Sequence, residues 1–273
     1  MKKDKNSEYV LGINEYELDR LKFQHSVWKE YTDKFFNRLK VGHGWKVLDA
    51  GSGPGFAARD LLLKVGNNGE VTIVEPAEFY LNYFKKYCIK NDITNVKYIL
   101  GNVENSELPQ NYYNLIFARW VIGFVPDPAV FLDRLVTALA PDGIIAFQDY
   151  VYEGLAVYPR GGAFEKAAEA VKAYWRLEGG DPYIAAKLPK MFEDRGIELI
   201  DFTPICRAGN PESPVYKWAH SFFKVHIHVM ADKGIISQKL ADEMLADWIE
   251  RRKHSDSIFF SPIVVDVAGR KPK

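Results

Sequence analysis

The segment VLDAGSGPG, residues 47–55, decides the fold of this chain. A short apolar run leads into three glycines at alternate positions, Gly51, Gly53 and Gly55, and a helical segment through residues 61–63 follows. Because glycine has no Cβ, it permits a sharp turn and lets a ligand approach the backbone. In an open α/β sheet such a turn lies at the carboxyl ends of the strands, where these folds bind ligands. The segment therefore predicts a strand, a ligand-binding turn and a helix.

The glycine pattern by itself also suits dinucleotides and phosphates, and two features narrow it. The spacing is D-x-G-x-G-x-G rather than G-x-G-x-x-G, and the Lys-Ser/Thr ending of a phosphate-binding loop is absent from it. The next apolar run, residues 71–74, ends in Glu75, whose carboxylate can accept hydrogen bonds from both hydroxyls of a ribose. Together these features favour a ribose-containing ligand at this turn.

Short apolar runs alternate with helical segments around this turn. We predict strands near residues 47–48, 71–74, 96–100, 114–118 and 144–147, and helices through 61–63, over 78–90 and over 129–139. Parallel neighbours need a crossover, so this order builds a parallel sheet with helices on both faces. After residue 150 the alternation loosens into helices at about 163–176, 187–195 and 213–254 and strands at 197–202 and 261–268. One or two further helices are expected over residues 8–44.

Five motifs in order give the chain a resemblance to class I S-adenosylmethionine-dependent methyltransferases. They are residues 49–55, Glu75-Pro76, the loop at 101–104 after the third strand, the fourth strand at 113–117, and the turn at 139–143 before the fifth strand. The resemblance covers about residues 40–150. It implies a Rossmann-like α/β fold with a central, mostly parallel seven-stranded sheet and helices on both faces, plus N-terminal helices and a helical lid.

The same resemblance implies S-adenosylmethionine as cofactor and S-adenosylhomocysteine as product. By position, Asp49, Gly51 and Gly53 would line the methionine end of the cofactor, together with the rest of the turn to Gly55, and Glu75 would hold the ribose. The remaining implied contacts are Asn102 and Val103 at the adenine, and Arg119 and Trp120 at the methionine part and the acceptor. Many relatives have Asp in place of Asn102, whose side-chain carbonyl can still accept from the adenine amino group. Core packing is the alternative for Trp120.

The wider chain resembles small-molecule methyltransferases of ubiquinone and menaquinone biosynthesis, on residues 17–25 and 180–192. In that setting Gln24 could cap the carboxylate end of the cofactor, with a packing role as the alternative. We expect residues 1–44 to form an N-terminal helical cap. Residues 45–273 would then form the methyltransferase domain, with helical insertions at about 150–183 and 210–257.

Composition limits the class of protein. The 273 residues are 47% hydrophobic and 26% charged, which is typical of a globular protein. Lys+Arg and Asp+Glu are both 36, so the basic excess of a nucleic-acid binder is missing. No run reaches the ~18 apolar residues of a membrane helix, and the start lacks the apolar stretch of a signal peptide. We therefore expect a small-molecule acceptor as partner, no nucleic acid, no membrane span and a cytoplasmic location; a homodimer is an open alternative.

The expected methyl transfer needs few catalytic residues that a sequence motif would reveal. A sulfonium methyl group is already activated, so its transfer requires alignment and removal of a proton from the acceptor, and positioning alone supplies on the order of 7–11 kcal/mol. We accordingly assign no catalytic residue and expect no metal, since the pair His226 and His228 has no third ligand at a supporting interval. Candidates for a base are His25, Asp149, His220, His226 and His228. Each is also an ordinary surface or core residue by its type.

The sequence gives weaker signals for the acceptor site than for the cofactor site. Aromatic residues gather over residues 150–183 and 218–223, which favours an apolar or aromatic acceptor, with Arg160 or Arg176 meeting an anionic group. Core packing is the alternative for these rings. Two other functions stay open: an RNA or protein methyltransferase, and a non-catalytic S-adenosylmethionine-binding protein. The Asn/Asp-Pro-Pro-Tyr/Phe signature of base methylation is absent after the fourth strand, where ARWV stands at residues 118–121.

Overall fold

The structure is a computed structural model that describes residues 14–273, so the part of the predicted N-terminal cap before residue 14 lies outside it. The chain divides into two compact units. The first takes the chain up to Arg119, with Ala129–Ala146 and Arg270–Lys273, and the second comprises Trp120–Pro128 and Phe147–Gly269. Within the described residues no helix is long and apolar enough to cross a membrane.

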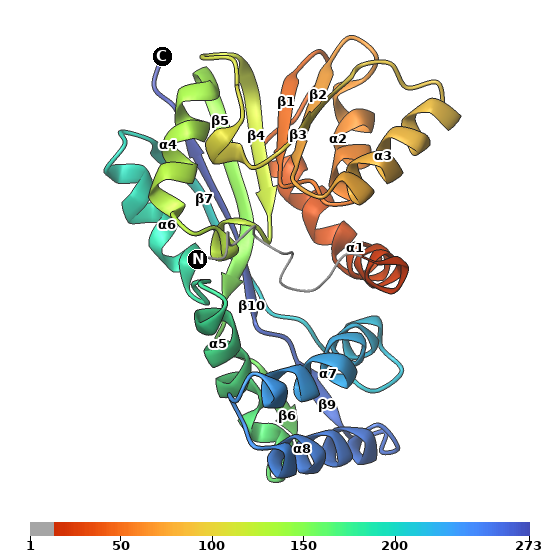
Figure 1. Cartoon of the computed structure of the whole chain (residues 1–273). Coiled ribbons are helices and arrows are strands. Elements are labelled where there is room, and N and C mark those ends of the chain that lie inside the picture. The colour runs from red at the N-terminus through yellow and green to blue at the C-terminus, as the bar shows by residue number, and fades with distance from the viewer. Residues whose placement is uncertain (1–13) are drawn as a thin grey trace, which may run out of the picture. The chain divides into compact units, whose positions relative to one another are not determined.

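A seven-stranded sheet in the order β3-β2-β1-β4-β5-β10-β7 forms the centre of the fold (Figure 1). Its strands are β1 (Lys46–Ala50), β2 (Glu70–Glu75), β3 (Val96–Leu100), β4 (Tyr113–Arg119), β5 (Leu139–Val151), β7 (Glu198–Ile205) and β10 (Ile263–Arg270). Strand β1 pairs in parallel with both β2 and β4, and β2 pairs in parallel with β3. The predicted seven-stranded, mostly parallel α/β fold is confirmed.

The register of the parallel strands brings their carboxyl ends to one edge. Asp49 pairs with Ile73 of β2 and with Phe117 of β4, and Glu75 pairs with Leu100 of β3. Parallel strands end together, so the residues that follow them share one edge of the sheet. The glycine turn, Glu75 and the loop after β3 therefore meet in the first unit.

Four helices belong to the strand–helix alternation of this part. They are α1 (Glu15–Arg38), α2 (Phe56–Val65), α3 (Glu78–Lys90) and α4 (Pro128–Ala138), and Figure 1 shows α2 and α3 beside β1–β3. The predicted N-terminal helices are one continuous helix in the described residues, capped by the Asn14 side chain, which accepts from the Glu17 N–H. Phe36 of α1 packs edge-on against Phe117 of β4, with ring centroids 4.9 Å apart. This contact holds α1 on the sheet.

One predicted turn differs from the structure. The segment 139–143 was expected to precede the fifth strand, but β5 begins at Leu139 and includes it. The chain still bends there, because Asp142 has φ 61°, a left-handed conformation that aspartate tolerates. The Lys271 N–H donates to the Gly143 carbonyl at 2.9 Å. This pairing extends the strand through the turn residues.

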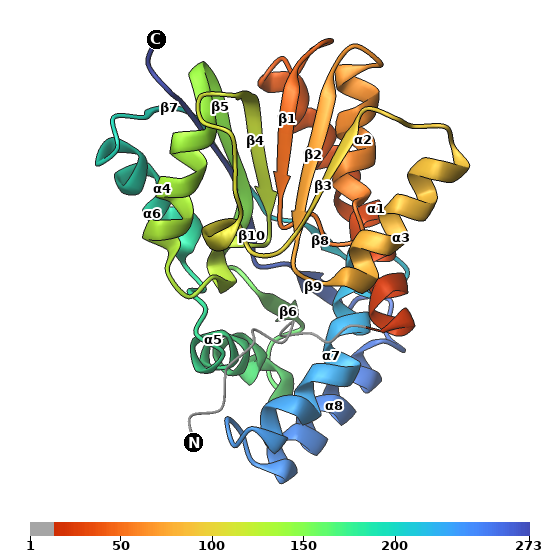
Figure 2. The same ribbon diagram turned by 45° about the horizontal axis from the view of Figure 1, so that its top comes forward.

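The second unit contains helices near the predicted ranges 163–176, 187–195 and 213–254, and a small sheet that was not predicted. Its further elements are η3 (Ala163–Lys166), α5 (Ala167–Leu177), α6 (Ile184–Glu193), α7 (Pro214–Asp232), α8 (Gln238–Arg251), β6 (Ala156–Tyr158), β8 (Ala208–Gly209) and β9 (Ile258–Phe260). Strand β9 pairs antiparallel with both β6 and β8 (Figure 2). Strands of two or three residues carry too little alternation to be recognised in a sequence.

Aromatic stacking forms the core of this unit. The Trp248 ring lies between Phe164 and Tyr216, at centroid distances of 4.3 and 4.4 Å and interplanar angles of 21° and 10°. Phe223 and Phe259 pack on the same indole. Core packing, the alternative given above for the aromatic residues of 150–183 and 218–223, therefore accounts for some of them.

Candidate active site

The glycine turn after β1 has the backbone that its sequence requires. Gly51, Gly53 and Gly55 have φ values of 76°, 53° and 75°, a region that side chains with a Cβ rarely adopt. The N–H groups of Gly51 and Ser52 both donate to the Val74 carbonyl, at 2.9 and 3.1 Å. A Cβ on Gly55 would clash with the ring of Phe84. The turn is thus fastened to β2 and to α3 at once.

Glu75 closes the turn from the end of β2. Its Oε2 accepts the Gly53 N–H at 2.7 Å, and its Oε1 accepts the Ala77 N–H at 2.9 Å. Burial raises the pKa of this carboxyl to about 7, against the effect of the two backbone donors. An ionised carboxylate offers about four acceptor positions, so two of them stay available to hydroxyl donors. The carboxyl can therefore hold the turn and accept from a ligand together.

Asp49 lies at the same edge and has acceptor capacity to spare. The side chain is buried, and its Oδ2 has no hydrogen-bond partner among residues 14–273. Burial raises the pKa of Asp49 to about 7, and the Arg119 guanidinium opposes that rise. A buried carboxylate oxygen without a donor is costly, so this atom fits a polar group of a bound ligand. The residues present thus suit the amino and ribose ends of S-adenosylmethionine.

The loop after β3 supplies the two residues expected at the adenine. Val103 begins the short 3-10 helix η1 (Val103–Asn105) and is buried, whereas Asn102 precedes it and is exposed. The Asn102 carbonyl accepts from the Ser106 hydroxyl at 2.7 Å. The Gly101 N–H donates to the Glu75 carbonyl at 3.1 Å, which ties this loop to the end of β2. Asn102 and Val103 therefore stand beside Glu75, with the Asn102 side chain open to solvent.

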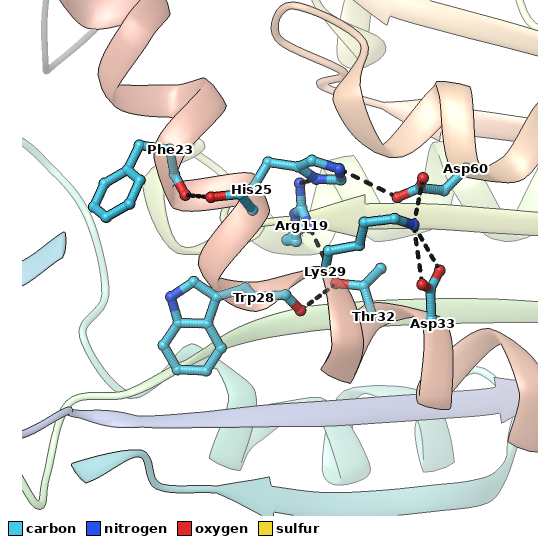
Figure 3. Close-up of polar contacts among 9 residues, drawn as sticks. Phe23, His25, Trp28, Lys29, Thr32, Asp33, Asp60 and Arg119 are labelled. Atoms are coloured by element: carbon cyan, nitrogen blue, oxygen red, sulfur yellow. Dashed lines mark hydrogen bonds and ion pairs between the residues drawn. The ribbon is translucent and has the colours of Figure 1, made fainter. Parts of the chain in front are cut away.

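Arg119 ends β4 in a network that reaches α1 and α2 (Figure 3). Its guanidinium donates to Thr32 Oγ1 at 3.0 Å and lies 3.1 Å from His25 Nδ1. On the other side of the imidazole, His25 Nε2 is 3.3 Å from Asp60, which also accepts from Lys29 at 2.7 Å. Arginine has donors only, so Nδ1 accepts and Nε2 carries the proton toward Asp60. The network fixes both the arginine and the imidazole.

His25 is consequently unsuited to act as a base. Burial lowers its pKa to about 3, and the charges of Arg119, Lys29 and Arg59 add to this. Its ring also stacks on Phe56, 5.6 Å away. Sequence analysis identified Arg119 but not the residues that hold it. His25, Lys29 and Thr32 stand at helical spacing on one face of α1, which is the signal that could have indicated them.

Gln24 lies in a buried cluster on the same helix. Arg20 makes two hydrogen bonds of 2.6 Å to the Glu17 carboxylate and a third, of 2.9 Å, to the Gln24 side-chain oxygen. The guanidinium thus holds that oxygen, and only the amide nitrogen side of Gln24 is suited to donate to a carboxylate.

Trp120 follows Arg119 and belongs to the second unit. It has φ 55°, which is strained for a bulky residue, and its backbone N–H donates to the Gln148 carbonyl at 3.0 Å. Its indole stacks on Tyr150, at a centroid distance of 6.0 Å and an angle of 18°. The strain and the stacking set the direction of the ring within this unit.

Asp149 anchors the turn that contains Trp120. Its Oδ1 accepts the Tyr150 N–H at 2.8 Å, and its Oδ2 accepts the N–H groups of Val121 and Gly123 at 3.2 and 3.4 Å. Burial raises the pKa of Asp149 to about 6, against the effect of these donors. With both oxygens engaged by backbone, the side chain serves the turn.

The other titratable candidates lie elsewhere in the second unit. His220 accepts from Trp248 Nε1 at 3.1 Å and lies 2.9 Å from Arg252, and burial lowers its pKa to about 4. His226 stacks on Phe222, with centroids 4.1 Å apart, and its Nδ1 lies 3.0 Å from the Phe222 carbonyl. Of the two arginines, Arg160 pairs loosely with Glu165 at 3.8 Å, and Arg176 lies over the ring of Tyr183.

This chain is similar to known methyltransferases. The methyltransferase domain family matches residues 42–199, more than half of the chain. The ubiquinone/menaquinone biosynthesis C-methyltransferase UbiE of Shewanella baltica is 25% identical over 229 residues, which are 73% of this chain and 87% of that protein.

Solved structures share the fold at low sequence identity. The YcgJ protein of Bacillus subtilis has a TM-score of 0.60 at 15% identity, covering 89% of this chain and 99% of its own. Geranyl diphosphate C-methyltransferase of Streptomyces coelicolor, solved with a thiolodiphosphate and S-adenosylhomocysteine, has a TM-score of 0.58 at 10% identity and covers 95% of this chain and 81% of its own. The chain therefore belongs to the methyltransferase domain family, as a class I, S-adenosylmethionine-dependent methyltransferase.

Proposed function

We propose that this enzyme transfers the methyl group of S-adenosylmethionine to a small organic acceptor with an apolar or aromatic body. The observation that carries the proposal is the pair of buried carboxyls, Asp49 and Glu75, on either side of the glycine turn. The first has an oxygen without a donor among the described residues, and the second has acceptor positions to spare. Such a site suits a ligand with an amino group and a ribose.

Each residue of the site then has a task in binding. Asp49 accepts from the amino group of the cofactor, and the backbone of Gly51 and Gly53, continued by Gly55, lines the methionine part. Glu75 accepts from the ribose hydroxyls. Asn102 and the Val103 backbone contact the adenine. Arg119, held by Thr32 and His25, presents its positive charge to the cofactor carboxylate, with a contribution from the Gln24 amide and from Trp120.

The reaction depends mainly on how the cofactor and the acceptor are positioned. When bound, S-adenosylmethionine supplies a methyl group already activated by its sulfonium charge. The chain's own residues hold the two reactants in line and exclude water, which can supply on the order of 7–11 kcal/mol. Neither His25 nor Asp149 has a free basic atom in the described structure, because protein donors or acceptors engage both. We therefore assign no general base.

The nature of the acceptor rests on the second unit and on the relatives. One relative is a C-methyltransferase of ubiquinone and menaquinone biosynthesis, and another is named for geranyl diphosphate, whose geranyl part is apolar. The second unit of this chain is correspondingly rich in contacting rings, among them Trp120, Tyr150 and Trp175. We propose that α1, the described part of the predicted cap at residues 1–44, serves as a helical cap. The helical insertions near 150–183 and 210–257 recognise the acceptor, and Arg160 or Arg176 meets an anionic group on it.

Transfer of radioactive methyl from S-adenosylmethionine to a panel of phenols, quinols and prenyl compounds tests the proposal. Wild type should label at least one member, and Glu75→Ala should lose that labelling. The matched control is Glu78→Gln, which removes an exposed carboxyl at the start of α3 and should leave labelling unchanged. Cofactor binding without labelling of any member would instead support a non-catalytic protein.

A further inference from the structure

Rings surround Trp175 of α5 on several sides within the second unit. Its indole contacts Phe124 edge-on at 4.7 Å, Tyr174 at 5.4 Å, Phe222 at 6.1 Å and Tyr152 at 6.5 Å. These five residues are called the Trp175 cluster below. Tyr150 contacts Tyr152 at 5.6 Å and stacks on Trp120, so a row of rings extends from the cluster to the residue that follows β4.

The polar atom of this cluster has no protein partner. Trp175 is 5% exposed, and its Nε1 finds no hydrogen-bond acceptor among residues 14–273. A buried N–H without an acceptor costs free energy, and most buried tryptophans avoid that cost by pairing the N–H. Aromatic faces and edges around it do not replace a full acceptor.

Trp248 of the same unit shows the ordinary arrangement. It too is buried among rings, yet its Nε1 donates to His220 Nδ1 at 3.1 Å. Both tryptophans therefore serve packing, but only Trp248 has its N–H satisfied within the described chain. The difference indicates that Trp175 is held for an acceptor atom that the protein itself does not supply.

We propose that Trp175 donates its indole N–H to a carbonyl or hydroxyl oxygen of a flat, apolar acceptor, whose body packs on the Trp175 cluster. The inference rests on the proposed function and names the feature of the acceptor that this enzyme selects. Half-buried Phe124 and Phe222 supply apolar surface, and the Trp175 N–H supplies a polar donor to the subsite, whose rings also include the phenols of Tyr152 and Tyr174. A site built around this donor discriminates against analogues that lack the oxygen, because the N–H is then left unpaired.

Two probes of equal shape test the proposal, 2-acetylnaphthalene, which carries a carbonyl, and 2-ethylnaphthalene, which does not. Wild-type protein with ¹⁵N-labelled tryptophan gives indole N–H resonances, and the one lost in Trp175→Phe identifies Trp175. We expect the acetyl compound to move this resonance downfield and to bind about three- to tenfold more tightly than the ethyl compound. In Trp175→Phe the two compounds should bind equally.

The stability of the variants separates a specificity role from a structural one. Both Trp175→Phe and Trp248→Phe shrink a buried ring, but Trp175→Phe removes an unpaired donor whereas Trp248→Phe removes a paired one. The melting temperature should therefore fall less in Trp175→Phe than in Trp248→Phe. Equal binding of the two probes to wild type, binding of neither, or an acetyl preference that survives in Trp175→Phe would overturn the proposal.

Titration with S-adenosylhomocysteine distinguishes a failure of the Trp175 proposal from a failure of the proposed function. None of the proposed cofactor contacts belongs to the Trp175 cluster, so Trp175→Phe should bind it as wild type does. Failure of wild type to bind S-adenosylhomocysteine would count against the proposed function, while the probe preference would still decide the assignment of Trp175.

Discussion

Two buried aspartates at strand ends, Asp49 of β1 in the first unit and Asp149 of β5 in the second, differ in what their oxygens contact. Burial raises the pKa of both, to about 7 and about 6. Asp149 uses both oxygens on three backbone N–H groups, whereas Asp49 Oδ2 has no partner among the described residues. Burial and a raised pKa are therefore common to a carboxyl that is engaged by backbone and to one that we propose to bind the cofactor, and spare acceptor capacity distinguishes them.

The same distinction separates the two units more widely. In the first unit, backbone N–H groups and carboxyls meet at one edge of a parallel sheet, and their positions follow from strand order. In the second unit the polar groups are mostly satisfied internally, as for Trp248 and His220. In the first unit, the strand order itself thus brings candidate ligand-binding groups together. In the second unit, a candidate group such as Trp175 Nε1 is identified only because it has no hydrogen-bond partner among the described residues.

The largest expected effect tests how strictly the glycine turn is built. Gly55→Ala combines a left-handed φ of 75° with a clash against Phe84, so we expect a loss of about 3 kcal/mol in the free energy of unfolding. Gly234 has φ 76° with open space around it, and Gly234→Ala should cost only about 1 kcal/mol. Urea denaturation measures both. Equal losses in the two variants would show that Phe84 yields easily and that the turn is less constrained than its contacts indicate.

The network behind Arg119 should be visible as a dependence of stability on pH. The pKa of His25 falls from 6.5 to about 3 on folding, so the unfolded chain binds a proton that the folded chain does not, and stability is lost as the pH falls below about 6.5. The groups that face the imidazole are Arg119, Lys29, Arg59 and Asp60. Between pH 7.5 and pH 5 the loss from this residue is about 2 kcal/mol.

His25→Gln removes the titration, so the difference in unfolding free energy between wild type and variant should shrink by that amount toward pH 5. Comparing the two proteins cancels the opposite slope of the carboxyls with raised pKa values, which are present in both. His43→Gln, at an exposed histidine outside this network, is the control. A pH-independent difference between wild type and His25→Gln would place the imidazole outside the buried network.

Most of the first unit could be predicted from its sequence because each element there has a local cause. The predicted helix 78–90 and strand 96–100 have the bounds of α3 and β3 in the structure. The glycines stand where the turn needs positive φ, and Glu75 ends the strand that pairs with β1. The support of Arg119 was missed, because its partners are about 90 residues away in sequence and only the packing of α1 brings them near.

The second unit was harder to predict because its contacts are not periodic. The strands β6, β8 and β9 are two or three residues long, and their pairing depends on chain segments up to about 100 residues apart. Aromatic residues in a sequence do not show which indole N–H is paired, so Trp248 and Trp175 are equivalent until the structure separates them. Whether an indole N–H has a hydrogen-bond acceptor thus depends on the tertiary structure.

Asp149→Asn tests whether the second of the two carboxyls serves the fold. Asparagine offers one oxygen and turns an NH₂ group toward backbone donors, so we expect a loss of about 1–2 kcal/mol in unfolding free energy at pH 7.5. Hydrogen exchange of the Val121 and Gly123 amides should accelerate together. Asp256→Asn, an exposed residue, is the control. Unchanged exchange at both amides would mean that the turn holds without Asp149, and would leave this carboxyl free for another role.

The smallest expected effect concerns protons taken up or released at Asp49 and Glu75. Burial raises the pKa of each to about 7 in the ligand-free protein, so both carboxyls are partly protonated near neutral pH. A cofactor that donates to both favours their ionised forms, so S-adenosylhomocysteine should release protons on binding and should bind more tightly as the pH rises from 6 to 8.

Calorimetry in phosphate and in Tris, which differ in ionisation enthalpy, measures the number of protons released. Asp49→Asn should release fewer protons than wild type, and the exposed Asp92→Asn should release the same number. An unchanged release in Asp49→Asn would mean that binding does not change the protonation of Asp49, and would contradict the predicted release from this carboxyl.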